Sequence, residues 1–172
     1  MPIARPASDE YAPFYETYVG KVTEPDLVAL LVSLKQATAT LLAGLTEAQA
    51  AHRYAPGKWT LREVIGHLAD AERVFAYRLM CIARGDTTPL PSFDENAYVP
   101  GGEFERRTLA SVAAELAAAR AATLALLDGL TPEALARRGT ASGKPVSARA
   151  LAYIIAGHEK HHMAVIRERY LK

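Results

Sequence analysis

The chain has little of several features that would place it in a special class of protein. It has a single cysteine, Cys81, so no intrachain disulfide can form, which favours a reducing compartment. The formal net charge is +1, and its acidic and basic residues are interleaved. This balance argues against a nucleic-acid or anionic-membrane surface. We expect no bilayer-spanning run, and Met1–Asp9 does not have the pattern of a signal peptide. These features predict a cytoplasmic protein with neither a membrane nor a nucleic-acid partner.

Sustained apolar and polar alternation of period two is also missing, so we expect no β-sheet. The chain instead shows four segments with helical hydrophobic periodicity, and each starts near a capping residue. We expect helices over residues 23–43, 60–84, 108–127 and from 147 almost to the C-terminus. Helices of this kind bury their apolar stripes against one another, which predicts an all-α four-helix bundle in a single domain, residues 1–172.

The connections between the helices divide the chain into two similar halves. Short segments around 46–52 and 131–137 each follow a Leu-Leu-x-Gly-Leu-Thr pattern, and we expect a short helix in both. The connection between the halves, 85–107, is long and rich in proline, glycine and acids. Connections of this length are usually functional or disordered, so we expect it to cross the bundle or line one end. Its acids Asp94 and Glu95 are candidates to close over a site.

Two histidines, His158 and His162, stand in the apolar stripe of the last helix, where leucine would be usual. Residues i and i+4 share a helix face, so both rings can reach one metal ion. The alternative is a pair of hydrogen-bonded core histidines, because burying imidazole without a partner is costly. His67, on the apolar edge of the second helix, is the candidate third ligand. We expect His161 at the stripe edge and His52 at the surface.

Two other metal motifs fit this segment less well. Residues 158–162 form an H-E-x-x-H pattern, as in zinc peptidases, but the chain ends ten residues later and supplies no downstream ligand. Residues 159–162 also read as E-x-x-H, as in di-iron bundles, but no second copy or set of inward glutamates accompanies it. A mononuclear site with three histidines and an open position is the better interpretation.

The chain resembles the DinB-like (DNA-damage-inducible) superfamily of metal-dependent enzymes. The resemblance rests on Trp59–Glu72, Leu90–Asn96 and Gly157–His162, and it extends to the tyrosine-rich segment Tyr11–Tyr18. It implies a four-helix bundle with an unusual, long crossover connection and frequent homodimers. It also implies a divalent metal ion held by three histidines, which correspond to His67, His158 and His162.

The resemblance implies less about the reaction. Characterised relatives include transferases and isomerases that use a low-molecular-weight thiol such as bacillithiol or mycothiol, and many others have no known reaction. The residues do not identify the metal, because imidazole binds Zn, Ni, Fe and Cu alike. The family name refers to induction by DNA damage, and the charge balance does not support DNA binding.

Several charged residues are candidates to assist the histidines. Asp70, one turn after His67, could orient that ring, accept a proton at the site or be a solvated acid. Glu159 is the second candidate proton acceptor, although it points about a right angle away from the stripe. Arg120 could bind an anionic substrate group, pair with Asp94 or extend to solvent.

These observations predict a metal-dependent enzyme that acts on a small-molecule substrate. A bound ion would activate water or a thiol, so the reaction would be thiol S-transfer to an electrophile or hydrolysis. The alternative is a non-catalytic, metal-stabilised protein of the stress response that acts as a binding or scaffold protein.

Overall fold

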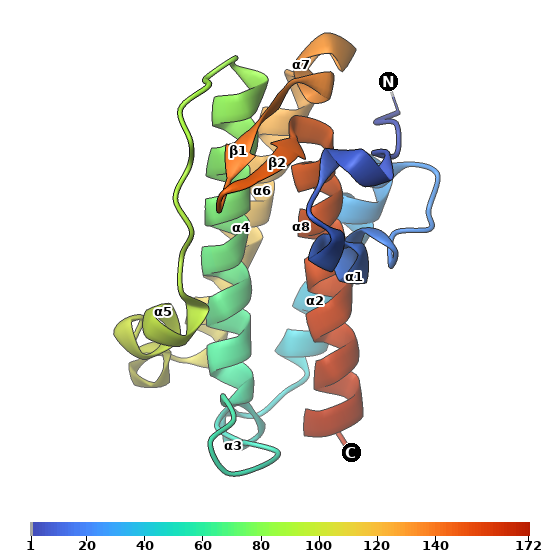
Figure 1. Cartoon of the computed structure of the whole chain (residues 1–172). Coiled ribbons are helices and arrows are strands. Elements are labelled where there is room, and N and C mark those ends of the chain that lie inside the picture. Colours follow the sequence, from blue (N-terminus) through green and yellow to red (C-terminus); the bar gives the residue numbers. More distant parts are fainter. Residues whose placement is uncertain (1) are drawn as a thin grey trace.

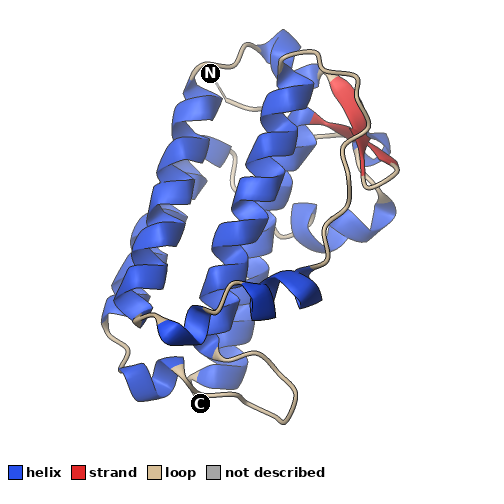
Figure 2. Cartoon of the chain, turned by 90° about the vertical axis from the view of Figure 1, so that its left-hand side faces the viewer, coloured by secondary structure: helices blue, strands red, loops and turns tan. Residues whose placement is uncertain are grey.

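The structure is a computed structural model, and it describes residues 2–172. Four long helices lie side by side, namely α2 (Leu27–Ala43), α4 (Leu61–Ala83), α6 (Leu109–Asp128) and α8 (Ala148–Val165). They pack in the cyclic order α2, α6, α4, α8, as Figures 1 and 2 show. The predicted four-helix bundle is confirmed.

Each long helix begins at a capping side chain that the sequence contains. The side chains of Asp26, Thr60, Thr108 and Ser147 each accept a hydrogen bond from the backbone N–H three residues later. Each bond satisfies one of the free N–H groups of a helix N-terminus. The predicted start of the first helix at residue 23 is wrong, because Asp26 has extended backbone angles and is itself the cap.

The connections within the two halves contain the predicted short helices, α3 (Glu47–Ala50) and α7 (Pro132–Ala136). The long connection between the halves leaves the end of α4 and runs back along the bundle, so that α4 and α6 are parallel (Figure 1). It holds α5 (Glu95–Gly101) and the 3₁₀ turn η3 (Phe104–Arg106), which both pack on α4. Contacts with α4 therefore hold the second half of the crossover connection in place.

The prediction of no sheet is wrong. Strands β1 (Arg138–Ala141) and β2 (Lys144–Ser147) form an antiparallel hairpin in which Arg138 is opposite Ser147. Its turn, Ser142–Gly143, has positive φ at both residues, 53° and 69°, which suits the twist of a two-residue hairpin. The Ser-Gly dipeptide was the available sequence signal, but the flanking strands contain glycine and proline and do not alternate clearly.

The N-terminal segment packs against α8. It contains η1 (Ser8–Glu10), η2 (Pro13–Tyr15) and α1 (Glu16–Val19). Glu10 accepts two hydrogen bonds from Arg149, from Nε at 2.7 Å and from Nη2 at 2.5 Å. Hydrogen bonding by Arg149 lowers the pKa of Glu10 to about 2, so this pair is ionised at neutral pH. The pair holds the segment that carries the tyrosine-rich residues beside the bundle.

At the other end of α8, the chain continues into the π-helical turn η4 (Ile166–Tyr170). The Tyr170 hydroxyl donates a hydrogen bond to the carbonyl oxygen of Trp59, 2.8 Å away. This bond joins the C-terminus of α8 to the residue that precedes the α4 cap. It therefore helps to fix Trp59 beside the start of α4.

A buried polar layer crosses the bundle and receives one residue from each long helix, namely Thr38, Glu72, Arg120 and Glu159. Arg120 donates to both oxygens of Glu72 at 2.7 and 2.8 Å, and its Nη1 lies 2.7 Å from Glu159 Oε2. The Thr38 hydroxyl donates to Glu159 Oε1 at 2.6 Å. The layer separates two apolar clusters, one toward each end of the bundle. The proposed pairing of Arg120 with Asp94 is therefore wrong.

The length and apolar composition of α6 correct the expectation that no segment is long enough to span a bilayer. Among the described residues, α6 is long and apolar enough, by length and composition alone, to cross a membrane. A single helix of this kind is weak evidence, because helices of soluble proteins pass the same test. Its apolar character comes mainly from alanine, and it carries Glu115 and Arg120 in ion pairs.

Candidate metal centre and pocket

Helices α4 and α8 bring three histidines together. His67 lies on α4, and His158 and His162 lie one turn apart on α8. The Nε2 atom of His158 is 3.1 Å from Nε2 of His67 and 3.1 Å from Nε2 of His162. One ligand nitrogen from each ring lies within 4.8 Å of the other two. The structure therefore brings together all three histidines that the sequence analysis singled out as ligands.

Burial keeps these rings neutral. His67 and His158 are 6% and 5% exposed, and His162 is partly buried. Desolvation lowers the pKa of His67 to about 4 and that of His162 to about 3. Desolvation, with the neighbouring histidines, places the pKa of His158 well below its ordinary value. Neutral imidazole is the form of histidine that binds a metal ion.

The donor set fits a divalent transition metal ion. Imidazole nitrogens bind Zn²⁺ at about 2.0–2.1 Å, so two donors of a tetrahedral ion lie about 3.3 Å apart. The two Nε2 separations of 3.1 Å are close to that value. A set of three protein donors leaves a further coordination position for water or substrate, as catalytic sites require. His67, His158 and His162 would hold such an ion.

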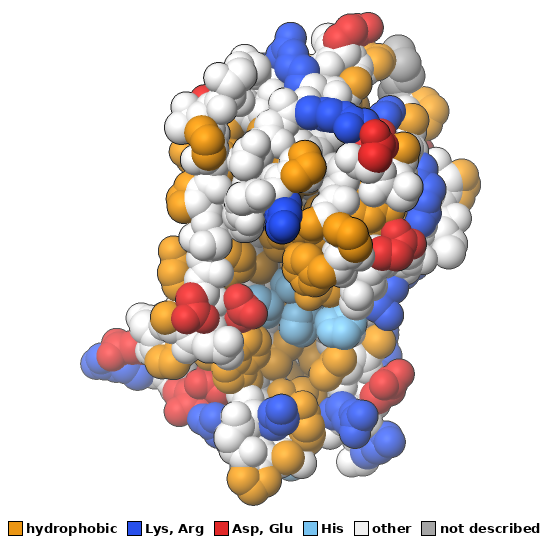
Figure 3. Space-filling view, viewed as in Figure 1, with side chains coloured by type: hydrophobic (Ala, Val, Ile, Leu, Met, Phe, Trp, Pro, Cys, Tyr) orange, Lys and Arg blue, Asp and Glu red, His pale blue; other side chains and the backbone are white. Residues whose placement is uncertain are grey.

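The histidines border a cavity of about 580 Å³. Figure 3 shows pale-blue histidine side chains in a hollow between hydrophobic side chains. The volume falls in the range of small-molecule sites. The other lining residues come from the N-terminal segment, the loop before α4, α4 itself, the crossover connection, the hairpin and α8. They are Ala12, Pro13, Phe14, Tyr15, Tyr18, Trp59, Phe75, Arg78, Phe93, Glu95, Ala141, Ser142, Lys144 and His161.

Aromatic rings surround the histidines. The ring centroid of Trp59 is 5.0 Å from that of His67. The ring centroids of Tyr18 and Phe75 lie 5.1 and 5.7 Å from that of His158, and both rings meet His158 edge to face. These rings restrict how the imidazoles can turn and keep part of the site free of water. The pocket therefore has an apolar wall with a few polar groups, as small-molecule sites usually have.

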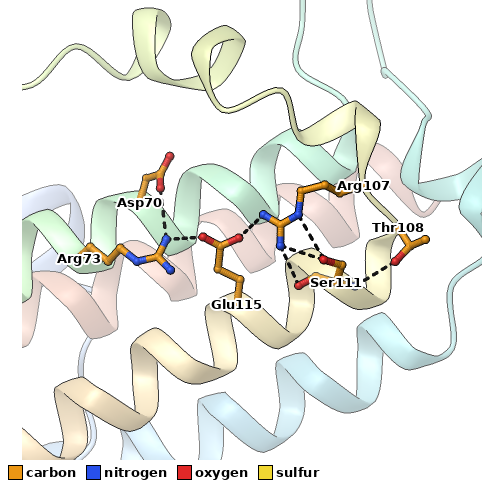
Figure 4. Close-up of polar contacts among 6 residues, drawn as sticks. All are labelled: Asp70, Arg73, Arg107, Thr108, Ser111 and Glu115. Carbon is orange, nitrogen blue, oxygen red and sulfur yellow. Dashed lines mark hydrogen bonds and ion pairs between the residues drawn. The ribbon is translucent and has the colours of Figure 1, made fainter.

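The structure places Asp70 outside the residues that line the cavity. Its carboxylate lies 3.5 Å from Arg73, which also pairs with Glu115, as Figure 4 shows. Burial raises the pKa of Asp70, and Arg73 partly offsets this effect. Glu115 in turn pairs with Arg107. Asp70 thus belongs to an ion-pair network between α4, α6 and the end of the crossover connection, and we do not retain it as a proton acceptor.

Glu159 is also held away from the cavity. Its side chain is 3% exposed and faces Arg120 and Thr38 in the buried polar layer. A carboxylate already engaged by a guanidinium and a hydroxyl, on the core side of α8, does not reach the pocket. We therefore drop the hypothesis that Glu159 acts as a general base, because the rotation of about 100° between the adjacent residues His158 and Glu159 turns the carboxylate away from the pocket.

The carboxylate that does line the cavity belongs to Glu95, at the start of α5. Its neighbour Asp94 caps α5 by accepting a hydrogen bond from the Asn96 N–H at 2.9 Å. His161 lies at the edge of the pocket against Tyr18, and His52 is exposed, both as predicted. Sequence reasoning missed Arg78 of α4, and it missed Ser142 and Lys144 because only the folded hairpin brings these two to the pocket.

Comparisons with solved structures show which known folds this chain resembles. YfiT from Bacillus subtilis, a probable metal-dependent hydrolase with an unusual four-helix bundle topology, has a similar structure, with a TM-score of 0.70 and 22% identity over 96% of this chain and 90% of that one. The mycothiol-dependent maleylpyruvate isomerase gives a TM-score of 0.65 with 16% identity. That match covers 81% of this chain and 58% of the isomerase. At such low sequence identities, the two matches establish a shared fold only.

A comparison with curated proteins finds no match. The family model of the DinB superfamily matches residues 30–166, which include all four long helices except the first turn of α2. It also includes all three clustered histidines. The bundle, its crossover and this match together assign the chain to a family: it belongs to the DinB superfamily.

Proposed function

We propose that this protein is a metal-dependent enzyme whose mononuclear centre is held by His67, His158 and His162. The observation that carries the proposal is the convergence of three neutral, largely buried imidazole Nε2 atoms on one side of a cavity of about 580 Å³. Three histidines packed for structure alone would not need an adjoining small-molecule pocket. The description of the structurally similar YfiT as a probable metal-dependent hydrolase is consistent with the proposal.

A bound divalent ion would supply Lewis acidity that lowers the pKa of a water molecule or thiol in its open position. Residues of the pocket supply the other functions that the reaction needs. Trp59, Tyr18 and Phe75 exclude bulk water and hold the rings. Glu95 is the carboxylate in the cavity lining, so we assign it the acceptance of the proton that the nucleophile loses.

Two reactions share this chemistry, namely hydrolysis of a small molecule and transfer of a low-molecular-weight thiol such as bacillithiol to an electrophile. YfiT supports the first, and the thiol-dependent isomerase supports the second. Hydrolysis needs no thiol, so an activity screen with and without thiol separates them. The second candidate function is a non-catalytic, metal-stabilised protein, which predicts a metal-dependent melting temperature but no turnover.

Metal analysis tests the centre directly. We expect about one equivalent of Zn, Ni or Fe in untagged protein and a large loss in His158→Ala. The matched control is His52→Ala, because His52 is exposed and lies outside the cavity. Absence of metal from the wild type, even after incubation with zinc and nickel, would contradict the proposal. Equal metal content in all three proteins would assign the metal to another place.

Homodimer formation and a cytoplasmic location stay predictions of the family resemblance and of the composition. Sedimentation analysis of the metal-loaded protein tests the first. A dimer gives twice the mass of the 18.6 kDa chain.

A further inference from the structure

Arg78 of α4 is a buried cation without an acidic partner. Among the described residues, three arginines are buried, namely Arg62, Arg78 and Arg120. Arg62 pairs with Glu47, and Arg120 pairs with Glu72 and Glu159. No carboxylate within residues 2–172 forms an ion pair with Arg78, although its side chain is almost fully buried at 2% exposure.

The neutral contacts of Arg78 leave part of its guanidinium unused. Nη2 donates to the carbonyl oxygen of Pro91 at 2.5 Å and to the Ser142 hydroxyl at 3.0 Å, whereas Nε has no hydrogen-bond partner. Burying an ionised group without a counter-charge costs several kcal/mol, so a folded protein rarely keeps one without a purpose. An anion from outside the chain would supply the missing counter-charge.

Arg78 lines the same cavity as the three histidines. It follows His67 by eleven residues on α4, about 16 Å along the helix axis. The wall between them is aromatic. The rings of His158 and Phe75 are 5.7 Å apart, those of Phe75 and Phe93 are 6.4 Å apart, and the Arg78 guanidinium lies 5.8 Å from the Phe93 ring. The pocket therefore runs from the histidines along an apolar wall to a cation.

The hairpin tip holds Arg78 from the opposite side. The Ser142 hydroxyl accepts a hydrogen bond from Arg78, and Ser142 is fixed in place by the two-residue turn of the hairpin. Lys144, which also lines the cavity, adds a second positive charge. With Glu95 as the acid of the lining and the histidines neutral, the lining carries a formal charge of +1 without metal, and a bound divalent ion would make it more positive, so both states favour an anionic ligand.

We propose that Arg78, Ser142 and Lys144 form a subsite for a carboxylate group of the substrate, at the end of the pocket remote from the histidines. The substrate is then an elongated small molecule with its carboxylate at one end, an apolar or aromatic middle and the reacting group at the other end. A guanidinium matches a carboxylate through two parallel hydrogen bonds. The inference rests on the proposed function for the position of the reacting group, but anion binding itself needs no metal.

The test measures binding of 4-phenylbutyrate and of its uncharged amide to zinc-loaded and zinc-free protein. Trp59 is the single tryptophan of the chain and lines the cavity, so its fluorescence reports occupancy. We expect the carboxylate to bind at least about tenfold more tightly than the amide in both forms, as one charged hydrogen-bonded pair implies. Arg78→Met should abolish this preference and leave the zinc content unchanged. The control is Arg84→Met, which removes an exposed arginine just beyond α4.

Two variants keep the test decisive if Arg78→Met does not fold. Arg78→Lys retains the charge without the planar fork, and Ser142→Ala removes the hydroxyl that holds the guanidinium. Both should weaken carboxylate binding several-fold. A preference that persists in Arg78→Met, that is unchanged in both other variants, or that disappears when zinc is removed would overturn the subsite. Failure of wild-type protein to bind either compound at millimolar concentration would also overturn it. Absence of zinc alone would contradict the proposed function but not the subsite.

Discussion

Gly157 of α8 lies directly against the backbone of Tyr18 in α1. A Cβ atom at position 157 would stand 2.0 Å from the Tyr18 carbonyl oxygen, a separation that no real contact allows. The glycine therefore lets α1 approach α8 next to His158, and this approach brings the Tyr18 ring onto the His158 ring. One absent side chain thus decides whether the tyrosine-rich segment can form a wall of the pocket.

Gly157→Ala should destabilise the protein by about 1–3 kcal/mol or more, because the new methyl group meets backbone atoms that cannot move without displacing α1. Chemical denaturation measures the change. Gly101→Ala is the control, since a Cβ at position 101 meets nothing within 4 Å. Equal stability of the two variants would contradict the close approach.

Arg120→Met should destabilise the fold by about 3–5 kcal/mol, because it leaves the carboxylates of Glu72 and Glu159 buried without a counter-charge. Arg73→Met provides the comparison. Arg73 also contacts two carboxylates, but its side chain is 49% exposed, so its removal should cost about 1 kcal/mol or less. Urea denaturation of both variants measures the difference. Similar losses of unfolding free energy would contradict the larger contribution that we assign to the buried ion pairs of Arg120.

The metal-free protein should lose stability as the pH falls from about 6.5 toward 4. Desolvation holds the pKa of His67 at about 4 and that of His162 at about 3 in the folded state, against an ordinary value of 6.5. Above pH 6.5 both states are neutral and these groups contribute no pH dependence. Below it the unfolded chain binds protons that the folded chain does not, so the free energy of unfolding falls.

Urea midpoints in a chelator between pH 7.5 and 5 measure this effect. Each histidine contributes a slope of at most about 1.4 kcal/mol per pH unit. His162→Asn should reduce the slope, whereas His52→Asn should leave it unchanged, because His52 is exposed. A stability that does not change across this range would mean that the buried rings accept protons in the folded state.

Glu95→Gln should lower the turnover rate by about 10²–10⁴-fold without loss of metal, as expected for a general base. Asp70→Asn should leave the rate within a few-fold of the wild type, because Asp70 pairs with Arg73 outside the cavity lining. The measurement is the turnover rate with whichever substrate the hydrolase and thiol-transfer screen identifies. A larger loss in Asp70→Asn than in Glu95→Gln would reverse the two assignments.

Local sequence was sufficient for the helices and for the histidine pair. The caps Thr60 and Ser147 act within three residues, so the starts of α4 and α8 could be read from the chain. His158 and His162 share a face because four residues make about one helical turn. The hairpin was missed because its own strands carry little alternation, and because its β-bridge from Ala141 to Leu90 joins residues that are distant in the sequence.

Periodicity, capping and motif spacing are local properties of the chain, and they were enough to predict the class of fold, the starts of α4, α6 and α8 and the three histidines. Which charges face the pocket depends on how the helices and the hairpin pack. Glu159 follows His158 directly, yet the helical rotation between them turns its carboxylate into the polar layer. Arg78 and Ser142 are 64 positions apart, and they meet because the hairpin folds over α4. Side chains from distant segments become neighbours only through packing, which no local pattern encodes.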